Sequence, residues 1–313
     1  PLSWPSPTAA RRAGGGTARP AVKIAGMTAP PVTSCELRQQ GDLRVLSWPA
    51  LASRGAQVMV TTRHGGVSAG PYATLNLSFS VGDDADAVLE NRRRVAAALG
   101  GDPGEFVFAR QVHGGAARVV SAADAGRGTL SFDDAIGPAD AMVTNDPRVV
   151  LAILVGDCVP IVLYDPVARV LACVHAGWRG TAAGVTQAAL TAMAGLGSRP
   201  ANVLAGLGPA IAPDRYQVGD DVREAITACL GDAAASVLAP DDAGRWLLDL
   251  WAANTVLLAR AGVPESQIHA AAIPTGGLFF SDRTARPCGR FALVARLTAR
   301  GATASQATDG SSR

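Results

Sequence analysis

Apolar residues occur along the chain in short runs that are separated by polar turns and by longer stretches of helical spacing. The runs are rich in β-branched residues, a pattern that predicts strands, over Val58–Thr62, Phe106–Val112, Arg118–Ser121, Val149–Val155, Ile161–Tyr164 and Val170–His175. Several of them are apolar at nearly every position, which indicates sheets covered on both faces.

Helical spacing predicts four helices. Asp84 is the predicted N-cap of the first, which ends at Gly100. The other three are predicted over Thr181–Leu196, Asp220–Leu230 and Trp246–Ala261. The predicted strands gather before most of the helices, so the order is not the strict alternation of a doubly wound fold. We therefore predict an α/β (α+β) fold: a layered sandwich of mixed β-sheets with outer helices, in a single domain.

The two ends of the chain lack this periodicity. Residues 1–40 are dominated by Pro, Ala, Gly and Arg, which cannot bury enough apolar surface to offset the entropy of ordering. We predict a flexible extension over residues 1–40, a folded domain over residues 41–298 and a flexible tail over residues 299–313. Because the sequence opens on Pro1, Met27 is the predicted natural start.

Composition narrows the class of protein. With 48% hydrophobic and 17% charged residues the chain can bury a large core, and a formal charge of +2 indicates no nucleic-acid partner. The five cysteines include no CxxC pair, which favours a reducing, cytoplasmic setting over a disulfide framework. The apolar stretch Val149–Tyr164 is too short for a membrane span and contains Pro160. We expect a cytoplasmic monomer without membrane contact.

Three side chains with metal-binding chemistry follow or close predicted strands. His113 and His175 are two of only four histidines, and Cys158 lies just beyond the run that begins at Val149. Such strand ends can converge on one sheet edge. Two imidazoles and a thiolate suit zinc with the fourth tetrahedral position open to water, which can then ionise near neutral pH. Asp157, the neighbouring carboxylate, is the predicted acid/base.

Other readings of these residues remain open. Cys158 could attack as a nucleophile with His113 or His175 as its base. A fourth protein ligand, for which His64 is the candidate, would instead close the metal sphere and give a non-enzymatic, zinc-stabilised interaction protein. Copper is less favoured than zinc, because multicopper centres need more imidazoles than four histidines provide.

An ordered set of motifs then makes a specific match. It comprises Thr62–Ser68 (TRHGGVS), Leu75–Leu77 (LNL), Val81–Asp84 (VGDD), Asn91–Arg92, Gln111–Gly114 (QVHG), Asp157–Cys158, His175–Gly180 (HAGWRG), Gly208–Ile211 (GPAI), Tyr216–Gly219 (YQVG), Leu248–Leu250 (LDL) and Phe279–Ser281 (FFS). Together these motifs resemble the YfiH-like family, whose members were once called laccase-domain or polyphenol oxidase proteins. The resemblance spans roughly Ser53 to Leu297.

The resemblance implies a layered α/β sandwich whose domain over residues 41–298 is a metal-dependent catalytic domain with His113, Cys158 and His175 as ligands. It implies purine nucleoside phosphorylase activity on adenosine, inosine or methylthioadenosine with phosphate, and adenosine deaminase activity. Some similar proteins are described instead as peptidoglycan-precursor editing amidases. The sequence departs from the family pattern at Gly156, where alanine is usual, and at Cys288, where threonine is usual. It also has a single arginine in Ser281–Thr284 where an adjacent pair is expected.

The same chemistry nominates further residues. Phosphate needs forked cations, for which Arg63 and Arg179 are the catalytic candidates. Asn76, Arg110 and Phe280, in or beside the matching motifs, are the candidates for substrate binding, with Phe280 stacking on the base unless it packs in the core. Arg92, Arg93 and Arg94 are predicted to form a solvated helix face, and His269 is predicted to be a structural residue.

Overall fold

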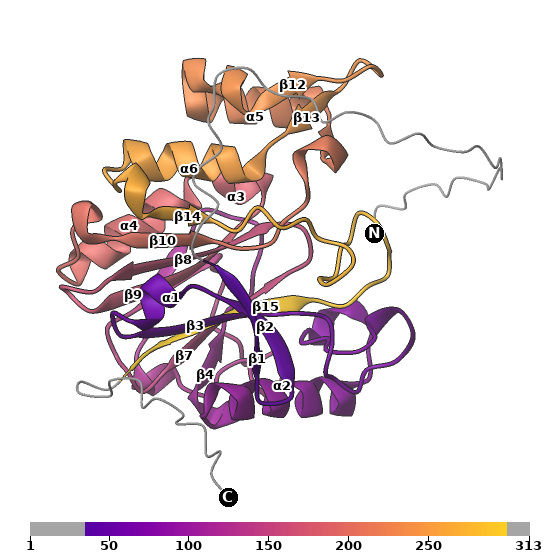
Figure 1. The fold of residues 1–313 in the computed structure, drawn as a ribbon, viewed down its shortest axis with the longest axis vertical. Coiled ribbons are helices and arrows are strands. Elements are labelled where there is room, and N and C mark those ends of the chain that lie inside the picture. The colour runs from indigo at the N-terminus through magenta and orange to yellow at the C-terminus, as the bar shows by residue number, and fades with distance from the viewer. Residues whose placement is uncertain (1–34, 299–313) are drawn as a thin grey trace, which may run out of the picture.

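Two six-stranded mixed sheets pack face to face in the computed structural model, which describes residues 35–298 (Figure 1). The first sheet has the order β1 (Glu36–Gln40), β2 (Leu43–Ser47), β3 (Ala56–Thr61), β15 (Phe291–Leu297), β7 (Val150–Val155) and β4 (Phe106–Phe108). The second sheet has the order β14 (Ile268–Ala270), β10 (Leu204–Leu207), β8 (Val159–Asp165), β9 (Val170–Ala176), β6 (Ala141–Thr144) and β5 (Ala117–Val119). The predicted layered sandwich of mixed sheets is confirmed.

Helices cover the outer faces of both sheets. The α-helices are α1 (Pro49–Ala52), α2 (Ala85–Leu99), α3 (Trp178–Ala182), α4 (Val185–Gly195), α5 (Asp220–Leu230) and α6 (Leu250–Arg260). A small third sheet has the order β11 (Gln217–Val218), β13 (Trp246–Leu248) and β12 (Leu238–Pro240). Short 3-10 helices lie at Gly70–Tyr72, Phe79–Val81, Pro103–Glu105, Ala122–Asp124, Pro200–Asn202, Pro213–Arg215, Gly231–Ser236 and Glu265–Gln267.

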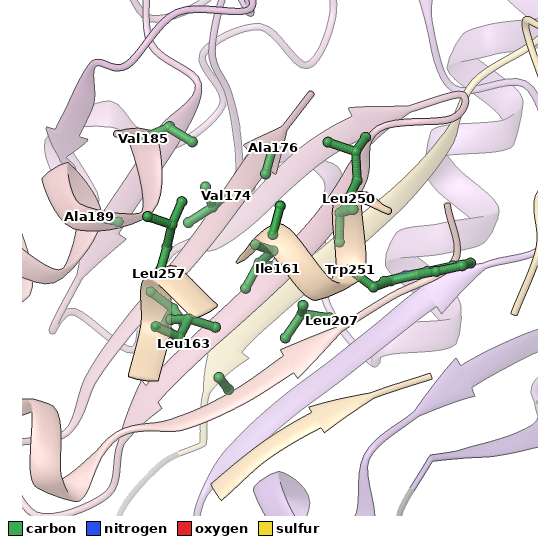
Figure 2. Close-up of a cluster of buried hydrophobic side chains, with 14 of the residues drawn as sticks. Ile161, Leu163, Val174, Ala176, Val185, Ala189, Leu207, Leu250, Trp251 and Leu257 are labelled. Atoms are coloured by element: carbon green, nitrogen blue, oxygen red, sulfur yellow. The ribbon is translucent and has the colours of Figure 1, made fainter. Parts of the chain in front are cut away.

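The continuously apolar strands are explained by this layering, because successive side chains of a strand enter different cores. On β8, Ile161 and Leu163 face the outer helices, whereas Val162 and Tyr164 face the first sheet. Figure 2 shows the outer core, where Trp251 and other α6 side chains pack over the second sheet. On the opposite side α2 covers the first sheet, as the view in Figure 1 shows.

Local capping explains where the predicted helices hold and where they do not. Asp84 caps α2 by accepting the backbone N–H of Ala87, as predicted. The helix predicted over Thr181–Leu196 is divided into α3 and α4, because Gly184 lies in the left-handed region with φ 77°. The helix predicted from Trp246 begins only at Leu250. Asp249 is its N-cap, and the residues before it pair as β13.

The boundaries of the folded unit also differ from the prediction at its start. Strand β1 (Glu36–Gln40) falls inside the segment predicted to be an extension, since it pairs antiparallel with β2. The remainder of that extension, with Met27, and the tail over residues 299–313 lie outside the described residues. Within residues 35–298, none of the helices has the length and apolar character that crossing a membrane requires.

The chain crosses from the first sheet to the second at two places that matter for function. The strand predicted over Phe106–Val112 ends at Phe108, and the chain then runs through residues 109–116 to β5 in the second sheet. A shorter crossing over residues 156–158 connects β7 to β8. His113 and Cys158 therefore lie on two crossings between the sheets.

Candidate metal centre and its cavity

The structure brings the three predicted ligands together. One ligand atom each from His113, Cys158 and His175 lies within 4.8 Å of the other two. The imidazole rings meet edge to face, with centroids 4.8 Å apart. Zinc–nitrogen and zinc–sulfur bonds of ordinary length would place tetrahedral ligand atoms about 3.5 Å apart. The cluster therefore fits one metal ion after movements of about 1 Å.

His175 comes from strand β9 and its ring is oriented by a buried carboxylate. Nδ1 of His175 lies 2.8 Å from Oδ1 of Asp140, so Nε2 is the nitrogen left for a metal. Burial acts to raise the pKa of Asp140, but hydrogen bonds from His175 and from the Gly114 backbone lower it below its usual range. The Asp140 carboxylate is thus charged and fully enclosed.

The same carboxylate shapes the loop that carries His113. Asp140 accepts the backbone N–H groups of Val112, His113 and Gly114 at 3.1, 2.9 and 2.6 Å. His113 has a φ of 59°, a left-handed conformation that costs a non-glycine residue roughly 1–2 kcal/mol. Three charge-assisted hydrogen bonds offset this cost and hold the imidazole at the cluster.

Asp140 is not among the residues predicted from the sequence, although the sequence carries a signal for it. It stands between Ala139 and Ala141 at the start of an apolar run, where an unpaired carboxylate would be strongly unfavourable. A buried acid beside metal-ligand candidates indicates a histidine partner. The spacing of the ligands alone does not reveal it, since the contact with His175 spans 35 residues.

We expect Asp140→Asn to weaken zinc binding by about 10- to 100-fold, because an amide cannot both accept the loop N–H groups and hold His175 as a carboxylate does. Competition with a chromophoric chelator measures the affinity. Asp146→Asn, which removes the charge of an acid that pairs with Arg148 outside the cavity, is the control. Unchanged affinity in Asp140→Asn would show that His175 is oriented by something else.

The cluster has an unusual charge state. Burial acts to raise the pKa of the Cys158 thiol, but the charge of His175 and hydrogen bonds from both histidines lower it to about 6. For His175, burial acts to lower the pKa, but the charge of Cys158 and the bond to Asp140 raise it to about 9. Without metal, the pair at neutral pH is a thiolate beside an imidazolium.

A cavity of about 900 Å³ opens beside the cluster. All three candidate ligands line it, and so does Asp157. The other polar and aromatic walls come from Ser78, Ser80, Asp282, Phe79, Phe108, Phe132, Tyr216, Gln111, Arg92, Arg283, Arg286 and Arg290. The cavity therefore combines metal-ligand chemistry with aromatic surfaces and cations, and it is large enough for a nucleoside together with a small anion.

The Asp157 carboxylate is engaged on both oxygens. The hydroxyl groups of Thr275 and Ser281 donate to Oδ1 at 2.5 and 2.8 Å, and the backbone N–H of Arg283 donates to Oδ2 at 2.7 Å. These bonds tie the crossing that carries Cys158 to the segment 275–283. The predicted acid/base role of Asp157 stays a prediction.

Three of the other candidates do not line the cavity: Phe280 and Asn76 lie in the packed interior, and Arg63 is partly buried. The Arg63 guanidinium donates twice to the Ala73 carbonyl and stacks 4.7 Å from the Phe280 ring, which is fully buried. Asn76 is also fully buried, and its amide bonds include one from the Arg290 backbone N–H. Their predicted roles with substrate stay predictions, and the observed contacts support one wall of the cavity.

The remaining arginine candidates are on the surface. Arg110 is exposed, and Arg179 is exposed with its guanidinium 4.1 Å from the Trp178 ring. Neither lines the cavity, and their roles also stay predictions.

Arg92 corrects the sequence analysis, which placed residues 92–94 on a solvated face. Its side chain is buried at 5% exposure between the rings of Phe79 and Phe108. The guanidinium donates to carbonyls of Leu77 and Gly128, and burial lowers its pKa to about 9. Arg92 thus joins helix α2 to two segments of the cavity wall.

Two further features bear on the predicted alternatives. His64 is exposed and does not belong to the three-residue ligand group found among residues 35–298. Gly156, where the family usually has alanine, is crossed by the Arg290 side chain, whose Cδ would lie 2.9 Å from an added Cβ. The single arginine of Ser281–Thr284 is accompanied in the cavity wall by Arg286 and Arg290.

Fold and site together define a helix-covered double-sheet sandwich with a candidate His–Cys–His metal centre at its sheet crossings. The family model described as multi-copper polyphenol oxidoreductase laccase matches residues 57–298. The chain therefore belongs to this laccase-domain family, to which the YfiH proteins also belong, and the predicted resemblance is confirmed.

Named relatives in this family are purine nucleoside phosphorylases. The enzyme YlmD of Geobacillus stearothermophilus is 37% identical over 240 residues, which cover 74% of this chain and 86% of that protein. Its crystal structure matches with a TM-score of 0.80 over 84% of this chain and 99% of that one, at 34% identity. The purine nucleoside phosphorylase of Deinococcus radiodurans is 40% identical, covering 77% of this chain and 88% of that protein.

Proposed function

We propose that this protein is a zinc-dependent purine nucleoside phosphorylase that also deaminates adenosine. The observation that carries the proposal is the meeting of His113, Cys158 and His175 at the wall of a cavity that also holds cations and aromatic rings. The names of the relatives support the reaction class and imply small-molecule substrates. Purine specificity, deaminase activity, cytoplasmic location and a monomeric state are further parts of the proposal.

The donor set favours zinc. Two imidazole nitrogens and one thiolate are ligands that zinc accepts in catalytic sites, with one position left open. A blue-copper site uses the same three ligands with a distant axial methionine or glutamine, and Gln111 in the cavity wall is held by the Leu154 backbone through both its amide oxygen and its amide nitrogen. Among residues 35–298, the methionines Met59, Met142 and Met193 are fully buried in the cores and do not line the cavity. Zinc bound here would supply a positive charge and an open coordination position facing the substrate.

The residues around the cluster can perform the rest of the chemistry. Asp140 fixes the ring of His175, and the Gly177 backbone lets α3 approach the ligands closely. Phe79, Phe108 and Phe132 offer apolar surface for a purine, and the arginines offer charge for phosphate.

The test combines metal analysis with product identification. We expect purified protein to carry about one zinc per chain. Adenosine and phosphate should yield adenine and ribose 1-phosphate, and removal of the metal by a chelator should abolish this turnover reversibly. Metal-loaded protein that converts no purine nucleoside would overturn the proposal. Full activity without metal would favour Cys158 as a nucleophile instead.

A further inference from the structure

Of three arginines in one segment of the cavity wall, one has no acidic partner. The carboxylate of Asp282 pairs with both Arg286 and Arg290, the latter at 2.9 Å. Arg283 makes no salt bridge to any of the residues 35–298. The charges of Arg286 and Arg290 are neutralised by a neighbouring carboxylate, whereas the charge of Arg283 is not.

The Arg283 guanidinium is anchored on one side and free on the other. Nη1 donates to the backbone carbonyls of Arg215 and Gln217 at 3.4 and 3.2 Å. Nε and Nη2 have no acceptor within the described part of the chain. The backbone N–H of Arg283 is fixed on Asp157, so the side chain starts from a defined position. A fork of unused N–H donors in a cavity wall is the geometry that recognises an oxyanion.

Tyr216 adds a neutral donor at the same place. The Arg283 guanidinium lies 5.3 Å from the centroid of its ring, and both residues line the cavity. Tyr216 is partly buried, and its hydroxyl makes no hydrogen bond to residues 35–298, so it is free to donate to a ligand in the cavity. Burial, together with the negative charge of Cys158, raises the pKa of Tyr216, so the hydroxyl stays protonated and can donate.

We propose that Tyr216 and Arg283 form the subsite that binds inorganic phosphate, a role that rests on the proposed phosphorylase function. The unused groups are all donors, and a phosphate oxygen can accept from each of them. The two carboxylates that line the cavity do not take these donors, because Asp157 already accepts three donors of the protein and Asp282 pairs with Arg286 and Arg290. The subsite lies in the same cavity as the three candidate metal ligands.

This placement agrees with the balance of phosphorolysis. An oxygen of HPO₄²⁻ bonds to C1′ of the nucleoside while the C1′–N9 bond breaks. The electron pair of that bond leaves with the purine, and the proton of the phosphate ends on the base. The anion must therefore be held beside the sugar before reaction, and fixed donors do this without reorganisation.

Phosphate binding by the zinc-loaded protein tests the proposal directly. Isothermal titration with inorganic phosphate, without nucleoside, should show affinity reduced about 10- to 100-fold in Arg283→Gln and about 3- to 10-fold in Tyr216→Phe. The KM for phosphate should rise in parallel, whereas the KM for adenosine and the zinc content should not change. Arg148→Gln removes a surface arginine that is paired with Asp146, and it should bind phosphate as the wild type does.

The outcomes separate this proposal from the proposed function. Wild-type affinity for phosphate in both variants would overturn the subsite. Arg283-dependent phosphate binding in a protein that converts no nucleoside would support the subsite and overturn the phosphorylase. Should Arg283→Gln fail to fold, Arg283→Lys keeps the charge and loses the fork. An affinity below that of the wild type then supports the subsite, and an unchanged one overturns it.

Discussion

Replacement of Gly177 by alanine is expected to weaken metal binding and turnover together. Gly177 precedes α3 with ordinary backbone angles, φ −80° and ψ 173°, so alanine meets no conformational strain there. Its Cβ, however, would lie 2.7 Å from the Cys158 sulfur and 3.3 Å from Cδ2 of His113. One added methyl group would therefore separate two of the three ligands.

The expected losses of zinc affinity and turnover follow from overpacking by the added methyl group and from displacement of the ligands. Forcing the methyl group into this contact costs about 1–3 kcal/mol, which is up to about 100-fold in zinc affinity. Displacing the reacting groups by about 1 Å lowers turnover by roughly another 100-fold. Zinc content by plasma emission spectrometry and the rate of adenosine phosphorolysis measure the two effects.

A second glycine supplies the matched control. Gly195 at the end of α4 has no atom within 4 Å of an added Cβ, and its φ is not positive. Gly195→Ala should keep full zinc content and activity. If Gly177→Ala also kept both, the ligands in the working protein would have to lie further from α3 than they do here.

Zinc affinity is expected to rise about 1000-fold between pH 6 and pH 9. The metal needs Cys158 as thiolate and His175 as neutral imidazole. With the pKa of Cys158 at about 6 and that of His175 at about 9, the thiolate is present above pH 6, but His175 must lose a proton until pH 9. One proton is therefore released per zinc in this window, which gives about one decade of affinity per pH unit.

Zinc affinity should rise with pH throughout this range, and its slope should change at the two pKa values. Below pH 6 Cys158 must also lose a proton, so the slope should steepen, and above pH 9 it should flatten as regards this pair. Chelator competition at a series of pH values measures the slope. Asp140→Asn removes the bond that helps to raise the pKa of His175, so its plateau should begin at lower pH. A pH-independent affinity in the wild type would contradict the thiolate–imidazolium pair.

Most of the architecture could be read from sequence because each layer leaves a periodic trace. The apolar runs identified β7 and β9 to within one residue and the middle of β8, and Asp84 marked the start of α2. Short strands with mixed exposure, such as β1, left no such trace. At Trp246 the local pattern suits a helix, and pairing with β11 and β12 makes it β13.

The site was predictable in its ligands and less so in its surroundings. His113, Cys158 and His175 stand out because rare side chains follow or close predicted strands. The partner of a ligand depends on strand register, which brings Asp140 to His175 and which no local spacing encodes.

The status of arginines was the hardest feature to predict. Arg92 occupies a helix rich in charge, yet it is buried by two phenyl rings from separate segments. Arg283 differs from Arg286 and Arg290 in its salt bridges, because Asp282 pairs with those two arginines and not with Arg283. Such differences arise from tertiary contacts, so sequence proposes cations for a phosphate site and only the folded structure says which one is available.

The placement of His113 and Cys158 on two crossings between the sheets has a mechanical consequence. A metal ion bound to both residues would cross-link the two sheets at one end of the sandwich. Without the ion, the two sheets would be joined there only by packing and peptide hydrogen bonds. Local opening in the apoprotein should then begin at this end, so that amides of 109–116 and 156–158 exchange faster than those in the middle of β8. The ion would therefore stabilise the packing of the two sheets in addition to its role beside the substrate.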